Sequence, residues 1–220
     1  MAINKGKLSA NIEARMEEFT QEITQAVAKY YDWWLSRYPA QTLYGFCLYS
    51  TPLVEYLGAT LFTEEGLTAV AEQYQNDHRF RHKSLAQLKQ TLRRSACDSP
   101  HHNENEDILE AINDKLQLLQ EDAEALESEE AYDAYLKALY AILVRALNEV
   151  KAMRPLNQQT ILFSVWFGDQ SDADIDYFVQ NCNDKEIIAS FISNGAEYCQ
   201  QKFSTQLAYF VYYRRGPTQY

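Results

Sequence analysis

Histidine and cysteine side chains, which are common zinc ligands, gather in the middle of the sequence. His78 and His82 lie four residues apart, which would place two imidazoles on one face of a helix, and Cys97 and His101 follow. Their spacing matches no established metal-binding pattern, and the arginines and lysines around the first two would repel a divalent cation. We therefore expect surface histidines, with no metal and no cofactor. The sequence leaves open whether the set ever binds a metal.

Carboxylates on predicted rigid elements provide a second possible chemistry. Glu55 lies in a strand-like run, Glu64 and Glu65 open a predicted helix, and Asp169 follows another predicted strand. Two such groups could act as general acid and general base, so one hypothesis is a hydrolase or transferase with a site near Glu55, Glu64 and Asp169. The alternative is helix capping and surface placement. The sequence contains no G-x-S-x-G motif and no glycine-rich phosphate loop.

Charge is distributed unevenly along the chain. The sequence holds 31 acidic and 20 basic residues, a formal charge of −11. Residues 104–133 carry twelve acids and a single base, Lys115, so the other residues carry 19 of each sign. A basic run lies just upstream, at residues 78–94, and the two blocks could face each other across a helical hairpin. This balance disfavours binding to nucleic acid.

The acidic segment suggests a surface that attracts a basic protein partner. The predicted partner-binding residues share one short stretch and are Glu121, Asp122, Glu124, Glu127, Glu129 and Glu130. Sixteen tyrosines could supply exposed anchors, or they could belong to a tyrosine-rich core. The simpler alternative for the charges is two solvated helix faces, on which each ion pair contributes only ~0–1 kcal/mol.

Hydrophobic periodicity predicts the elements that would position these residues. Apolar residues recur at steps of three and four from Ile12 to Trp34, which indicates a long helix over 9–37 that ends before Pro39. Runs rich in apolar and aromatic residues predict strands at 43–49, 53–61 and 160–167. Thr63 is a predicted N-cap. Further helices are expected at 106–152, as a hairpin, and at 171–180, 184–192 and 198–213.

These elements predict an α+β fold: a small, mainly antiparallel sheet covered by helices, with a long N-terminal helix and an inserted charged helical hairpin. We expect a single domain over residues 1–220. No uncharged run is suited to span a bilayer, the N-terminus lacks the apolar stretch of a secretory signal, and the four cysteines form no C-x-x-C pair. These features predict a cytoplasmic protein with no membrane association.

Two stretches resemble an uncharacterised bacterial family, catalogued as domain of unknown function 4303. The first runs from Tyr44-Gly-Phe-Cys-Leu-Tyr-Ser to Ala59-Thr-Leu-Phe-Thr-Glu-Glu-Gly-Leu67, and the second lies within 143–194 and includes ILFSVWFGDQSDADI. The resemblance implies a fold and no activity. By analogy, such members look like small acidic immunity-type proteins found beside bacterial toxin genes.

The leading expectation is thus a non-enzymatic cytoplasmic interaction factor, of an immunity or antitoxin type, that binds a basic protein partner through its acidic helical segment. The carboxylate-based hydrolase or transferase is the alternative. The sequence leaves the oligomeric state open, including a homodimer formed through the helix at 9–37.

Overall fold

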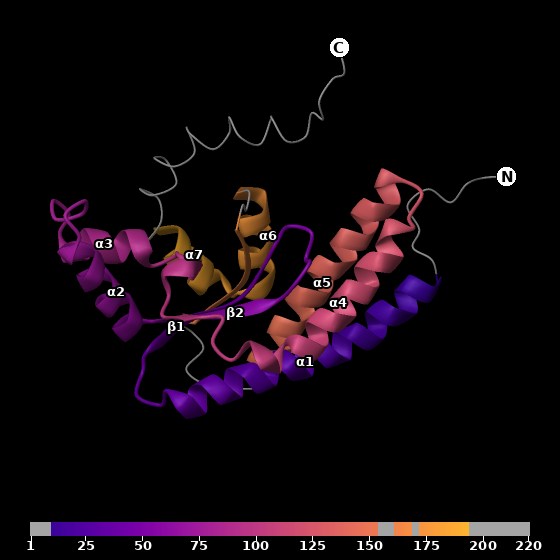
Figure 1. Cartoon of the computed structure of the whole chain (residues 1–220), viewed down its shortest axis with the longest axis horizontal. Helices are drawn as coiled ribbons and strands as arrows, with labels where there is room; N and C mark the ends of the chain where they lie inside the picture. The colour runs from indigo at the N-terminus through magenta and orange to yellow at the C-terminus, as the bar shows by residue number, and fades with distance from the viewer. Residues whose placement is uncertain (1–9, 154–160, 169–171, 194–220) are drawn as a thin grey trace, which may run out of the picture.

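A computed structural model describes residues 10–153, 161–168 and 172–193 (Figure 1). Its elements, in chain order, are α1 (Ala10–Arg37), β1 (Leu43–Ser50), β2 (Gly58–Thr63), α2 (Glu64–Asn76), α3 (Leu85–Leu92), the 3₁₀ helix η1 (Ala96–Asp98), β3 (His101–His102), the 3₁₀ helix η2 (Glu106–Ile108), α4 (Glu110–Glu124), α5 (Glu129–Met153), β4 (Leu162–Phe167), α6 (Asp172–Cys182) and α7 (Lys185–Ser193). The predicted α+β class, the long N-terminal helix and the helical hairpin are confirmed. The predicted helix at 198–213 lies outside the described residues.

The described strands form one sheet in the order β3-β2-β1-β4. β2 pairs antiparallel with both β1 and β3, whereas β4 pairs parallel with β1. β1 is a central strand, which explains its nearly continuous apolar sequence. The prediction that the second strand begins at residue 53 is wrong. The chain turns at Val54, whose φ is 55° and whose amide bonds the Thr51 carbonyl at 2.9 Å, so Glu55 lies in a loop.

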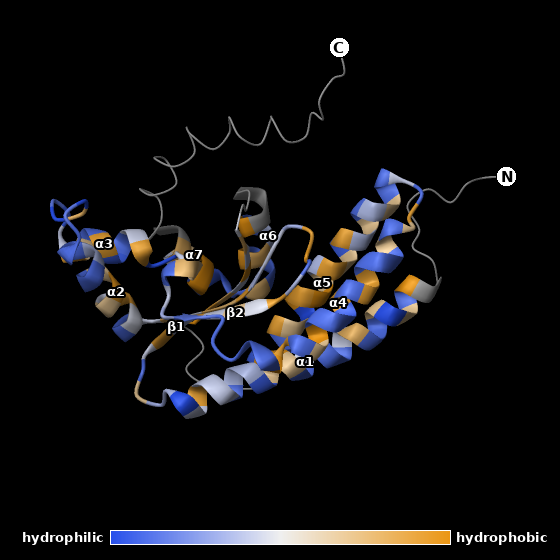
Figure 2. Cartoon of the chain, in the orientation of Figure 1, coloured by the Kyte–Doolittle hydropathy of each residue, from blue (hydrophilic) through white to orange (hydrophobic). Residues whose placement is uncertain are grey.

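α1 packs along one face of the sheet and then continues past it. Near its C-terminal end, Tyr30 and Tyr31 are fully buried, and the ring of Tyr31 meets Phe46 of β1 edge-on at 5.2 Å. The same ring lies 6.0 Å from Phe163 of β4. Each fully buried side chain of this size contributes roughly 1.5–3 kcal/mol of hydrophobic stabilisation. The rest of α1 forms a bundle with the hairpin (Figure 2).

The hairpin consists of α4 and α5, which bury their apolar stripes against α1. In α4 the stripe includes Ile112, Leu116 and Leu119, at helical spacing, as the sequence predicts. Ser128 begins α5 by accepting a hydrogen bond from the amide of Ala131 at 3.1 Å. The hairpin extends away from the sheet, so its turn lies at one end of the molecule (Figure 1).

The opposite face of the sheet is covered by shorter elements. Cys47, Phe62 and Trp166 project from it and pack with Ala96 of η1 and Phe191 of α7. α6 packs against β4, with Phe178 meeting Phe167 edge-on at 5.5 Å. Both faces of β1 are therefore enclosed.

Candidate functional site

The six predicted partner-binding acids come together at the turn of the hairpin. Glu121, Asp122 and Glu124 end α4, Glu127 lies in the turn, and Glu129 and Glu130 begin α5. We call these six residues the acidic tip. Five of them are exposed, and Asp122 is half-buried because Arg15 of α1 approaches it to 2.5 Å.

Few acids of residues 104–133 are neutralised by bases. Glu104 is paired with His101, and Asp122 is paired with Arg15. Within the residues that the structure describes, the other ten are exposed and take part in no ion pair. Lys115, the base of the segment, is bonded to Glu22 of α1 instead. The negative charge is therefore presented to solvent.

The basic run does not face the acidic tip, so the expectation that the two blocks oppose each other across a hairpin is wrong. Residues 78–94 belong to the α2–α3 end of the molecule, far along its longest axis from the turn between α4 and α5 (Figure 1). Several of its bases have partners outside the hairpin: Arg79 binds Asp77 at 2.7 Å, and Arg94 bonds the carbonyl of Phe191 in α7. They are consequently not arranged to neutralise the hairpin.

The helix dipoles stabilise one half of the acidic tip and destabilise the other half. Glu129 and Glu130 lie in the first turn of α5, where a negative charge is stabilised by the positive end of the helix dipole. Glu121 and Glu124 lie in the last turn of α4, where the dipole is negative and no base is present. The acids that end α4 therefore oppose the stability of their own helix.

The tyrosines largely belong to the core. Tyr30, Tyr31 and Tyr135 are fully buried, and among the described residues the exposed tyrosines are Tyr56 and Tyr177, neither of which lies at the acidic tip. Burial raises the pKa of Tyr135. The exposed large apolar side chain that lies nearest the tip in sequence is Leu118 of α4, at 52%.

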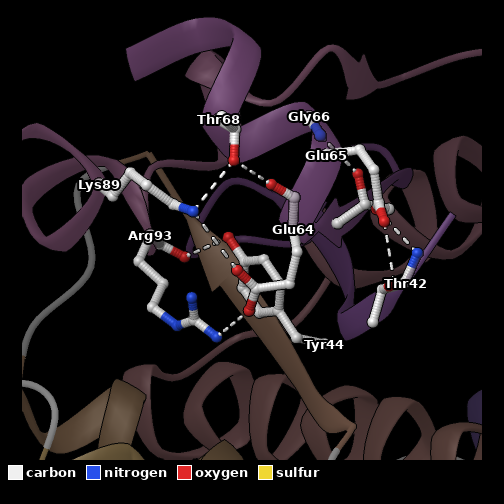
Figure 3. Close-up of polar contacts among 9 residues, drawn as sticks. Thr42, Tyr44, Glu64, Glu65, Gly66, Thr68, Lys89 and Arg93 are labelled. Atoms are coloured by element: carbon white, nitrogen blue, oxygen red, sulfur yellow. Dashed lines mark hydrogen bonds and ion pairs between the residues drawn. The ribbon is translucent and has the colours of Figure 1, made fainter. Parts of the chain in front are cut away.

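Glu64 is neutralised at the start of α2 by a base of α3, Lys89, and by the base that follows α3, Arg93 (Figure 3). Its carboxylate is 2.5 Å from a guanidinium nitrogen of Arg93 and 3.9 Å from Nζ of Lys89. Arg93 also lies over the ring of Tyr44, 4.1 Å from its centroid. Glu64 thus fastens α2 to α3.

Glu65 anchors the loop that precedes β1. It accepts hydrogen bonds from the backbone amide of Thr42 at 2.7 Å and from the Thr42 hydroxyl at 2.9 Å, and the amide bond is the largest cause that lowers the pKa of Glu65 (Figure 3). Thr63 caps α2, as predicted, by accepting from the Gly66 amide at 3.0 Å. Both glutamates therefore have local structural partners.

The structure does not bring the predicted carboxylate site together. Glu55 and Glu64 lie beyond opposite ends of β2, and Asp169 lies outside the described residues. The cavity between Tyr44, Leu67 and Asp98, near Glu64, has a volume of about 10 Å³, which is room for roughly one water molecule. A wider groove lies between α5 and α6, but Glu149, the carboxylate on its wall, is bound to Arg145 at 2.8 Å.

The histidines and the cysteine that were considered as zinc ligands are also dispersed. His78 and His82 are exposed between α2 and α3, as expected of surface histidines, and Cys97 is exposed on η1. The expectation of surface histidines is wrong for His101, which is buried in β3. Nowhere in the described parts of the chain do three or more His, Cys, Asp or Glu side chains form a group that could hold a metal ion.

His101 instead belongs to a buried polar network that sequence reasoning missed. Its ring nitrogens lie 2.8 Å from Oε2 of Glu104 and 2.7 Å from Oε1 of Gln41. Tyr38 donates to Oε1 of Glu104 at 2.7 Å, and Thr63 donates to Gln41 at 2.8 Å. We call these five residues the His101 network. The short sequence from His101 to Glu104 is its one local signal, since the other members are distant along the chain.

Comparisons with known proteins provide information on the family of the chain. None of the described helices has the length and apolar character needed to cross a membrane. Searches of curated proteins and of solved structures found no match. A family model described as a domain of unknown function, DUF4303, matches residues 23–174, which include α1 from Ile23 onward, the sheet and the hairpin. The chain therefore belongs to the DUF4303 family.

Proposed function

We propose that the protein is a non-enzymatic interaction factor whose acidic tip binds a basic protein partner. The observation that carries the proposal is that ten acids of residues 104–133 are exposed without an ion pair in the described structure, and that they concentrate on a projecting hairpin. We further propose a bacterial cytoplasmic role of the immunity or antitoxin type, which fits a compact protein that masks a basic surface.

A projecting hairpin with exposed negative charges favours rapid association with a positively charged partner. Exposed charges steer encounter and can raise association rates by roughly 10- to 1,000-fold at low ionic strength. The acids that end α4 support this role because they oppose the helix dipole, so helix stability does not account for them.

Leu118 offers a contact on which binding could centre. It lies on α4 four residues after Asp114 and three before Glu121, so these side chains share one helix face. An exposed apolar side chain bordered by charge is the arrangement of many interfaces, in which the centre is apolar and the rim polar. We expect a partner with a small apolar recess ringed by lysine or arginine.

The test uses the full chain as bait in a lysate of its own organism, followed by purification of the captured protein. A variant with Glu124, Glu127, Glu129 and Glu130 changed to Gln should associate with that protein at least tenfold more slowly at low salt. The matched control changes four exposed acids away from the hairpin, Glu72, Asp176, Asp184 and Glu186, to the corresponding amides. Circular dichroism checks that both variants fold. Equal association rates for the two variants would refute the proposal.

A further inference from the structure

The imidazole of His101 is buried between two oxygen atoms. His101 is only 4% exposed, and its Nδ1 lies 2.8 Å from Oε2 of Glu104. Its Nε2 faces the amide oxygen of Gln41 at 2.7 Å. A neutral imidazole has one N–H, so it could donate to only one of these neighbours.

The orientation of the Gln41 amide follows from Thr63. The Thr63 hydroxyl accepts from the Gly66 amide at 3.0 Å and donates to Gln41 Oε1 at 2.8 Å. With the amide reversed, its NH₂ group would point at this hydroxyl, whose proton would then lose its acceptor. The oxygen of Gln41 therefore faces His101, and both ring nitrogens of His101 must act as donors.

We infer that His101 is a buried imidazolium that forms an ion pair with Glu104 at neutral pH. The proton belongs to the ring because imidazole is intrinsically more basic than a carboxylate. Tyr38 also stabilises the carboxylate by donating to its other oxygen at 2.7 Å. The rings of Trp34 and Tyr38 pack against the imidazole, with ring centroids at 5.3 and 4.6 Å, and hold it in place.

The other ionisable groups near His101 come from α1 and from the segment after β3. Tyr30 donates to the backbone carbonyl of Glu104, and Glu104 and Glu106 both help to raise the pKa of Tyr30, after burial. These two carboxylates favour a positive imidazole, whereas Arg37, which lies 5.9 Å from the Tyr38 ring, opposes it. The closest charge is that of Glu104, so the anionic neighbours dominate.

The ion pair joins segments that are distant in sequence. Its network connects the end of α1, the loop before β1, the N-cap of α2 and β3 to Glu104, which is the first acid of residues 104–133. Loss of the second proton would remove one of the two donors and loosen the entry to the hairpin.

Nuclear magnetic resonance of the full chain with ¹⁵N-labelled histidine tests the inference, which does not rely on the docking proposal. At neutral pH both ring nitrogens of His101 should show the shifts of protonated nitrogen. His102, whose pKa is lowered by burial, should show a neutral ring and serves as the internal reference. A neutral His101 ring at that pH would overturn the inference.

A pair of variants distinguishes the specific contact between His101 and Glu104 from the general effect of nearby negative charge. Glu104→Gln should lower the proton affinity of His101 by tenfold or more, because it removes the adjacent anion. Glu106→Gln, which changes an exposed acid two residues away, should change it much less. Equal effects of the two substitutions would contradict the pairing. If Glu104→Gln does not fold, the wild-type spectrum alone decides.

Discussion

Asn183 shows how one side chain can complete a sheet. Its Oδ1 accepts from the Phe163 amide at 2.8 Å, and its Nδ2 donates to the Phe163 carbonyl at 2.7 Å, as a neighbouring strand would. β4 is an edge strand of the described sheet, and an exposed edge can pair with other chains. Asn183 therefore seals part of that edge and fixes the break between α6 and α7.

Replacing Asn183 by Ala should destabilise the protein by about 1–3 kcal/mol, because two backbone groups of β4 lose their partners. Urea unfolding measures this change. Gln180→Ala, at an exposed position near the end of α6, is the control and should have little effect. Equal losses in the two variants would show that Asn183 does not have this role.

The described cysteines should differ widely in reactivity. Burial raises the pKa of Cys182 to about 12 and also raises the pKa of Cys47, so both remain protonated thiols near pH 8. Cys97 is exposed. In a Cys199→Ser background, iodoacetamide should label Cys97 at least tenfold faster than the other two cysteines, as measured by peptide mass spectrometry. Comparable labelling of Cys47 would contradict the burial described here.

At the scale of elements, the hairpin combines a favourable and an unfavourable set of charges. Glu124→Gln should stabilise the protein by about 0.3–1 kcal/mol, because it removes a negative charge from the negative end of α4. Glu129→Gln should destabilise it by a similar amount, because its charge lies at the positive end of α5. Thermal unfolding at low salt measures both changes in stability. Changes of the same sign in the two variants would contradict this electrostatic account.

The helices and the central strands were predictable because their patterns are local. The apolar spacing of α1, α4 and α5 marks the faces that they bury, and Thr63 marks the start of α2. β2 was extended too far because Val54 and Leu57 are apolar and buried, as strand residues would be, although the chain follows a turn around Val54. β3 has two residues, His101 and His102, which is too short to produce any periodicity.

The candidate site was predictable only in part. Charge composition identified the acidic tip, since a hairpin turn brings near neighbours in sequence together. The His101 network was missed because Gln41, Thr63 and Glu104 meet only after the sheet has formed. Glu64 was grouped with Glu55 from the sequence, although its partner in the structure is Arg93, the residue that follows α3.

At the scale of the whole molecule, the protein has two electrically different ends. At the α2–α3 end, four bases are bound to Asp77, Glu64 and the carbonyl of Phe191, whereas the acidic tip has one ion pair among the described residues. Because α1 runs beneath the sheet and along the hairpin, it holds the tip at a fixed position relative to the sheet. The molecule therefore presents its excess charge on a rigid projection.

The most direct measurement is the salt dependence of binding between the full chain and the protein that it captures. The account predicts that affinity falls steeply from low to high ionic strength, and that changing Glu124, Glu127, Glu129 and Glu130 to Gln flattens this dependence. The control that neutralises Glu72, Asp176, Asp184 and Glu186 should retain the wild-type slope. Binding that is insensitive to salt, or slopes that are the same for both variants, would contradict the central claim.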